Sequence, residues 1–294
     1  MTVWKKMFDR FLSTLSLVSR FPVKARFKFD ASRMDFYLPI TGLFPAVLGF
    51  AVYFAALWLS GLKLFAVAAG IFVQYLGFNL FHLDGLADTA DAFLGSQSRE
   101  RRFAILKDSR VGVYGLFAGI SAPAFKLLLL YGILGGGNGL TTYTDLLVFI
   151  YPVSGRFGAA LIPCITPPAK PEGLGALASG SRVRRVLAGT LAALLAGWAL
   201  IFAAASASAE TADIWKAFII IPYFALPLLA GLVSAVFYAH VYRKALGGYS
   251  GDALGAAIET GETIFLLLAA VAFNILGGAE AWAAHSFSSW YNPV

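Results

Sequence analysis

Three aspartates, Asp84, Asp88 and Asp91, follow one another at intervals of four and three residues in the stretch "FHLDGLADTADAF". On a helix these intervals place the second side chain about 40° and the third about 20° from the first, so one narrow face carries all three carboxylates. Like charges on one face repel, and a cation in front of them relieves the repulsion. Mg²⁺ takes carboxylate oxygens and keeps waters that phosphate oxygens can replace. The pattern therefore predicts a magnesium site with these three aspartates as ligands.

A basic stretch follows these aspartates along the chain. It surrounds a fourth aspartate, Asp108, with five cationic side chains: Arg99, Arg101, Arg102, Lys107 and Arg110. Guanidinium and ammonium groups bind phosphate oxygens, and together with carboxylates and a metal ion they are typical of a phosphoryl or nucleotidyl transfer site. The structural alternative is that the aspartates cap the N-terminus of a helix while the basic residues are solvated in a loop. Three aligned aspartates exceed what capping requires, which favours the metal site.

A second acidic group lies in the later stretch "LGGYSGDALGAAIETGE". Asp252 precedes an apolar segment, and Glu259 and Glu262 fall in the first turns of that segment. Ionisable groups in a membrane helix normally face a wet or paired interior. Two alternatives follow. The three carboxylates hold a second ion or bind ribose hydroxyls, or the two glutamates pair with Arg156 or Lys126 as buried structural salt bridges.

The elements that must position these residues are membrane helices. Of the 294 residues, 59% are hydrophobic and 13% are charged, and the mean hydropathy is +0.74. This is not the composition of a soluble domain, and the apolar runs are long enough to cross a bilayer. The sequence predicts one all-α membrane domain over residues 1–294, in which residues 36–276 form a polytopic integral membrane helical bundle. About seven transmembrane helices are expected, near residues 36–60, 62–80, 112–134, 144–163, 184–206, 217–241 and 255–276.

The positive charges are distributed unevenly between the predicted connections. Nineteen of the 23 Lys and Arg residues fall in the N-terminal segment and after the second, fourth and sixth spans. By the positive-inside rule these parts are cytoplasmic. The C-terminal tail, residues 277–294, is then expected on the other side of the membrane. The predicted outer turns "GGGNG" and "SASAETAD" are expected on that side as well. The net charge of +7 is thus a topology signal, and no nucleic acid partner is predicted. Within residues 1–35, apolar and basic side chains at helical spacing predict an amphipathic helix in the cytoplasmic interface.

Several motifs together resemble one known family. The stretches "FHLDGLADTADAFLG", "RERRFAILKDSRVGVYG" and "LGGYSGDALGAAIETGE" are similar, in this order, to those of the cobalamin synthase family, adenosylcobinamide-GDP ribazoletransferase. "SRFPV" at Ser19–Val23 and "PEGLG" at Pro171–Gly175 resemble family stretches as well. The resemblance runs from near residue 16 to about residue 268.

This resemblance implies a Mg²⁺-dependent enzyme of the bacterial or archaeal cytoplasmic (inner) membrane. Its substrates would be adenosylcobinamide-GDP and α-ribazole or α-ribazole 5′-phosphate. Its products would be adenosylcobalamin, or adenosylcobalamin 5′-phosphate, and GMP. The implied partners are these small molecules and the lipid bilayer, and the sequence leaves open whether the chain forms a homo-oligomer.

The predicted roles of the site residues follow from this chemistry. Asp84, Asp88 and Asp91 are the expected metal ligands, and Asp108 is a further ligand or the base that accepts the hydroxyl proton. Lys107 and Arg110 are expected to hold the diphosphate. The expected substrate-binding residues are Arg99, Arg102, His82, Asp252, Glu259 and Glu262. For His82, a helix-end histidine bonded to the backbone is the structural alternative.

Two other functions compete with this interpretation. A CDP-alcohol phosphotransferase that makes phospholipids uses similar chemistry, but "DGLADTAD" lacks the arginine that those enzymes place soon after their DG pair. An ion-coupled transporter needs acidic residues near the bilayer midplane, often in repeated halves. This chain instead places its carboxylates at the predicted cytoplasmic ends of spans and has no evident repeat, so an enzyme is favoured.

Overall fold

A computed structural model of the chain describes residues 2–20, 26–95, 98–135, 148–173, 175–206 and 214–290. Within these ranges the regular elements are helices, and the β-structure consists of one isolated bridge between Pro168 and Tyr249. The all-α prediction is therefore confirmed. In chain order the elements are α1 (Val3–Val18), α2 (Met34–Thr41), α3 (Leu43–Ser60), α4 (Lys63–Gln74), the π-helical turn η1 (Tyr75–Asn79), α5 (Leu80–Phe93), α6 (Arg99–Ile105), α7 (Val113–Gly135), α9 (Tyr151–Ile165), the 3₁₀ turn η2 (Gly175–Ala178), α10 (Val183–Ser206), α11 (Ile214–Leu246) and α12 (Gly251–Trp290).

Six helical stretches in the described part of the chain are long and apolar enough to cross a membrane. They are Met34–Ser60, Lys63–Phe93, Val113–Leu134, Val183–Leu200, Phe224–Leu246 and Gly251–Ala272. Large apolar side chains on this bundle remain exposed, among them Phe72, Phe117, Leu191 and Phe237. An apolar surface of this kind suits contact with lipid. The backbone of these helices can also lie in lipid, because helices satisfy their own backbone hydrogen bonds. The polytopic membrane bundle predicted from the sequence is thus confirmed.

The predicted span at residues 144–163 differs from these six. Its helix, α9, has 15 residues, and all of those from Tyr151 to Ile162 are buried. At 1.5 Å per residue α9 extends about 22 Å, which is shorter than the roughly 30 Å hydrocarbon core of a bilayer. Neighbours α2, α10, α11 and α12 surround it, so its apolar residues face protein and not lipid. Hydropathy indicates burial at this segment but does not distinguish a protein interior from a membrane.

The second predicted span, residues 62–80, continues much further than expected. The helix runs from Lys63 to Phe93, with the π-helical turn η1 between α4 and α5. No proline interrupts it, and the residues after the apolar run include alanine and leucine, which favour helix. The aspartates of "DGLADTAD" therefore stand on a rigid continuation of a membrane helix.

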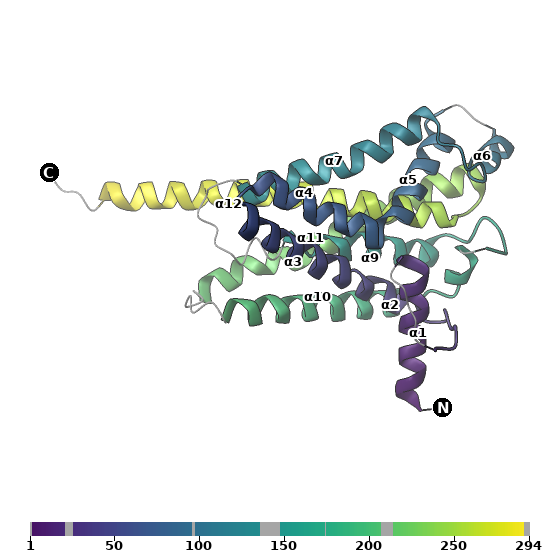
Figure 1. Cartoon of the computed structure of the whole chain (residues 1–294), viewed down its shortest axis with the longest axis horizontal. Coiled ribbons are helices and arrows are strands. Elements are labelled where there is room, and N and C mark those ends of the chain that lie inside the picture. Colours follow the sequence, from purple (N-terminus) through teal and green to yellow (C-terminus); the bar gives the residue numbers. More distant parts are fainter. Residues whose placement is uncertain are drawn as a thin grey trace.

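The two ends of the chain extend from the bundle in different ways. Figure 1 shows α1 lying across the direction of the long helices, and its first residues Trp4 and Phe8 are exposed. Leu12, Leu15 and Val18 of the same helix are buried. The predicted N-terminal helix is confirmed, and its exposed apolar residues are suited to a membrane interface.

At the other terminus α12 continues to Trp290, so most of residues 277–294, predicted as a separate tail, is helical (Figure 1). The helix projects beyond the other helices of the bundle. The predicted outer turns after Gly135 and Ser206 lie outside the described residues.

Candidate functional site

Three polar stretches of the chain meet at one end of the bundle. The first stretch comprises the end of α5 and the short helix α6. The second is the loop with residues 167–173 and 175–178 (the 167–178 loop), and the third is the turn between α11 and α12. All three lie at the end where α1 is found, on the right of Figure 1. Helix α6 contacts both α5 and α11, and α5 contacts α12. The carboxylates and basic residues singled out in the sequence therefore belong to neighbouring surfaces.

Glycines allow α5 and α12 to cross at close range. A Cβ atom on Gly85 would lie 3.0 Å from the carbonyl oxygen of Asp252. One on Gly255 would lie 3.0 Å from the carbonyl oxygen of His82. The absence of side chains at both positions lets the two backbones approach each other. The crossing places Asp252, in the first turn of α12, beside the turn of α5 that carries Asp84.

Four carboxylates cluster around this crossing. Asp84 is exposed, whereas Asp88, Asp91 and Asp252 are half-buried. The carboxylate of Asp88 is repelled by those of Asp84, Asp252 and Asp91, and Asp252 is repelled by Asp84. In the described part of the chain no salt bridge neutralises any of the four. The predicted concentration of negative charge is present, and Asp252 adds to it from a distant part of the sequence.

The four carboxylates do not form a closed protein cage. Among the described residues, no group of three or more His, Cys, Asp or Glu side chains is arranged to hold a metal ion. Mg²⁺ is usually bound by one or two carboxylates together with waters and substrate phosphates. The carboxylates of Asp84, Asp88 and Asp252, which no salt bridge in the described structure neutralises, fit such an open site, because phosphate oxygens complete the coordination.

Asp91 has a structural task in addition to its predicted role as a metal ligand. Its two carboxylate oxygens accept hydrogen bonds from the backbone N–H groups of Gly112, at 2.7 Å, and Gly115, at 2.9 Å. These groups belong to the N-terminus of α7, where backbone amides lack partners and the helix dipole favours a negative charge. A Cβ atom on either glycine would overlap the Asp91 carboxylate. For Asp91 the structure therefore agrees with the alternative in which an aspartate caps the N-terminus of a helix, here α7.

The predicted catalytic residues Asp108 and Arg110 pair with each other. The Arg110 guanidinium donates to both carboxylate oxygens of Asp108, with a shortest distance of 2.6 Å, and 86% of the Arg110 side chain is exposed. This hydrogen bonding lowers the pKa of Asp108 to about 2. A carboxylate of such low basicity is a weak acceptor for a hydroxyl proton. The structure thus leaves Asp108 and Arg110 engaged with each other on an exposed loop.

The remaining predicted arginines also have partners. Arg99 donates to the carbonyl oxygen of Leu246 at 3.0 Å, which satisfies the C-terminus of α11. The guanidinium of Arg102 lies 5.1 Å from the centre of the Phe93 ring. These contacts attach α6 to the ends of α11 and α5, so both arginines stabilise the region around the carboxylates.

His82 lies beneath the aspartates and away from solvent. Its side chain is 2% exposed, and its Nε2 atom has no hydrogen-bond partner among the described residues. It lines a small crevice of about 40 Å³ together with apolar residues of α1, α2 and α12, including Leu17, Met34 and Ile258. The imidazole therefore faces an apolar space, and the predicted contact of His82 with substrate stays a prediction.

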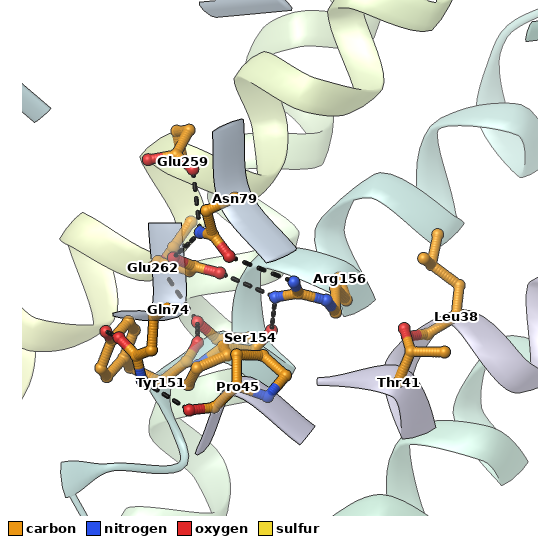
Figure 2. Close-up of polar contacts among 12 residues, drawn as sticks. Leu38, Thr41, Pro45, Gln74, Asn79, Tyr151, Ser154, Arg156, Glu259 and Glu262 are labelled. Atoms are coloured by element: carbon orange, nitrogen blue, oxygen red, sulfur yellow. Dashed lines mark hydrogen bonds and ion pairs between the residues drawn. The ribbon is translucent and has the colours of Figure 1, made fainter. Parts of the chain in front are cut away.

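Glu259 and Glu262 lie in a buried ionic network in the interior of the bundle (Figure 2). Lys126 donates to Glu259 at 2.7 Å and to Glu262 at 2.5 Å, while Arg156 donates to Glu262 at 2.9 Å. Asn79, in the π-helical turn, donates to both glutamates at 2.9 Å. Both glutamate side chains are 0% exposed. The alternative of structural salt bridges with Lys126 and Arg156 is therefore confirmed for both residues.

A cavity of about 280 Å³ opens next to Asp252. Besides Phe81 of α5, three segments line it: α6 with the residues that follow, the 167–178 loop, and the turn that leads into α12. Its polar lining includes Lys107, which was predicted to hold phosphate. It also includes Lys170, Glu172 and Ser250, which sequence reasoning did not assign to the site. The sequence gives only weak evidence that these residues belong to the site. The stretch "PPAKPEGLGALASGSRVRR" shows charged residues and glycines in one connection but does not indicate which of them face a ligand.

The helix crossing provides a prediction about stability. Gly85→Ala is expected to lower the free energy of unfolding by about 1 kcal/mol or more, because the added methyl group must displace the backbone of α12. Gly119→Ala is the matched control, since a Cβ atom there meets nothing within 4 Å. Thermal unfolding of the two variants in detergent measures the difference. Equal melting temperatures would show that the crossing tolerates a larger residue.

Comparison with known proteins identifies relatives along nearly the whole chain. A model of the family described as cobalamin-5-phosphate synthase matches residues 10–270. The chain is 32% identical over 268 residues to the adenosylcobinamide-GDP ribazoletransferases of Shigella boydii serotype 4 and Escherichia coli K12. Each match covers 89% of this chain and 99% of the relative. No solved structure matches the chain.

Proposed function

Because the chain belongs to the cobalamin-5-phosphate synthase family, and is thus an enzyme of cobalamin nucleotide-loop assembly, we propose that it joins adenosylcobinamide-GDP to α-ribazole or α-ribazole 5′-phosphate and releases GMP. The observation that supports this reaction is the meeting of α5 and α12. Asp84, Asp88 and Asp252 converge there without salt-bridge partners among the described residues, beside a cavity that contains lysines. Carboxylates for a divalent ion and cations for phosphate are the groups that transfer from a diphosphate requires.

The reaction exchanges one P–O bond for another. The ribose hydroxyl oxygen of the ribazole attacks the phosphorus that carries the cobinamide arm, and the bond from that phosphorus to the GMP oxygen breaks. The hydroxyl proton passes to a base, and the electron pair of the broken bond leaves with GMP. Asp84, Asp88 and Asp252 would hold Mg²⁺, and the bound ion would supply positive charge to balance that of the diphosphate and of the departing GMP.

Asp108 is a poor candidate for this base. Asp108 is hydrogen-bonded to Arg110 and has a pKa of about 2. A carboxylate of such low basicity accepts a hydroxyl proton poorly, so we do not assign the base to Asp108. In this proposal Asp88 is a ligand of the divalent ion.

The same proposal includes the orientation in the membrane. The segments with most of the Lys and Arg residues lie at the carboxylate end of the bundle, and short basic connections stay on the cytoplasmic side. The site would then face the cytoplasm of a bacterial or archaeal cell. Hydrophilic substrates would reach it from that side, while the exposed apolar side chains keep the enzyme in the inner membrane.

A product assay tests the proposed reaction. Purified protein in lipid nanodiscs is expected to release GMP from adenosylcobinamide-GDP only when both α-ribazole and Mg²⁺ are present. EDTA should abolish the release and added Mg²⁺ should restore it, because the carboxylates alone would repel the diphosphate. Chromatography quantifies GMP and the corrinoid product. Release of CMP from CDP-diacylglycerol, with no GMP from adenosylcobinamide-GDP, would instead identify a phospholipid synthase.

A further inference from the structure

The cavity beside Asp252 has a defined wall that backbone hydrogen bonds hold in place. The N–H of Ala169 donates to the carbonyl of Tyr249 at 2.8 Å, and the N–H of Tyr249 donates to the carbonyl of Pro167 at 3.0 Å. The Tyr249 hydroxyl donates to the carbonyl of Gly175 at 2.8 Å. These bonds tie the 167–178 loop to the turn before α12. The cavity is therefore preformed by main-chain contacts between distant segments.

Two lysines face each other in this cavity. Lys107 follows α6 and Lys170 belongs to the opposite loop, and both line the space. The ammonium group of Lys170 lies 4.5 Å from the centre of the Phe103 ring. The charge of Lys107 repels that of Lys170, while the carboxylate of Asp252 attracts it. Two like charges held next to each other are unfavourable unless an anion joins them.

In the described structure the carboxylate of Asp252 attracts Lys170, but no protein carboxylate lies within salt-bridge distance of either lysine. The salt bridges there involve neither Lys107 nor Lys170, although Glu172 and Asp252 also line the cavity. The N-terminus of α12, with Gly251, forms part of the same lining. The positive end of a long helix dipole favours negative charge nearby. The cavity thus combines two lysines and a helix N-terminus that suit an anionic ligand.

The other side of the cavity connects to the carboxylates. Asp252 lines the cavity and also belongs to the acidic group with Asp84 and Asp88. A ligand that extends from the lysines past Asp252 must therefore carry more than one anionic group. One group binds the lysines, and another lies close enough to the carboxylates to share a divalent ion with them. A nucleoside diphosphate has this arrangement. At about 280 Å³ the cavity suits a nucleotide portion.

We propose that this cavity binds the guanosine nucleotide portion of the substrate, with Lys107 and Lys170 in contact with the phosphate that leaves as GMP. This inference rests on the proposed function and deepens it by assigning a residue, Lys170, and a place to the nucleotide. The second phosphate, which carries the cobinamide arm, then lies toward Asp252 and the α5 aspartates. The ribazole hydroxyl must approach from the side opposite the lysines, since the leaving and attacking oxygens are in line.

Lysine variants test this assignment by nucleotide binding, which does not depend on turnover. Isothermal titration of detergent-solubilised protein with GDP and Mg²⁺ is expected to show at least about 10-fold weaker binding for Lys170→Ala and for Lys107→Ala, because each loses a charge-assisted hydrogen bond. Lys170→Arg should retain most of the affinity. Lys244→Ala is the matched control, since Lys244 is an exposed lysine of α11 outside the cavity lining.

Steady-state kinetics gives a second readout. Lys170→Ala is expected to raise the KM for adenosylcobinamide-GDP while the KM for α-ribazole stays the same. Equal GDP affinity in wild-type protein, Lys107→Ala and Lys170→Ala would overturn the assignment of the cavity, even with full GMP release by the wild type. Lysine-dependent GDP binding in a wild-type protein that releases no GMP would support the cavity and refute the proposed reaction.

Discussion

Asp84→Asn and Asp88→Asn are each expected to lower the rate of GMP release by about 100-fold or more, with little change in folding. Each substitution removes a negative charge that attracts the divalent ion and keeps nearly the same side-chain volume. Changes to groups that only support metal ligands already cost about 10- to 100-fold, so the loss of a ligand should exceed this. Because neither carboxylate is neutralised by a described salt bridge, no structural partner is lost with them.

Initial rates of GMP release at several Mg²⁺ concentrations measure this effect. Glu100→Gln is the matched control, since Glu100 is an exposed carboxylate of α6 at the same end of the bundle. Asp91→Asn should differ from the first two variants, because it also weakens the cap on α7 and lowers stability by about 0.5–2 kcal/mol. Near-normal rates for both Asp84→Asn and Asp88→Asn would remove the basis of the proposed mechanism.

Glu262→Gln is expected to be the most destabilising substitution in the buried network, at about 3–5 kcal/mol. Arg156 pairs with Glu262 and with no other carboxylate in the described structure, so the substitution leaves a buried guanidinium without a counter-charge. Glu259→Gln should cost less, because Lys126 still has Glu262 as a partner. Thermal or denaturant unfolding in a fixed detergent gives the order of the two variants.

A charge-balanced double variant separates pairing from packing. Lys126→Met alone leaves Glu259 without a cationic partner, whereas Lys126→Met with Glu259→Gln removes one cation and one anion and keeps the Arg156–Glu262 pair. The double variant should therefore be more stable than Lys126→Met. A double variant as unstable as the sum of the two single changes would show that the network acts through shape and not through charge balance.

Local patterns along the chain predicted most of the individual elements. Helical spacing of apolar residues predicted α1, and apolar runs predicted the membrane bundle, because a helix must bury or expose whole faces. The intervals between Asp84, Asp88 and Asp91 correctly placed them on one helix. The same reasoning left two roles open for Glu259 and Glu262, namely ligand binding and buried salt bridges. A buried carboxylate needs a partner, but the sequence does not say which one.

By itself, then, the sequence determined the class of fold, the helix that carries the aspartates and the family to which the chain belongs. Only the tertiary structure decided that Asp91 caps α7 and that Lys170 stands beside Lys107. The physical reason is that periodicity defines the faces of one helix, whereas contacts between helices depend on how closely their backbones approach. Two glycines, Gly85 and Gly255, permit that approach where α5 meets α12, and thereby bring Asp252 to the aspartates of α5.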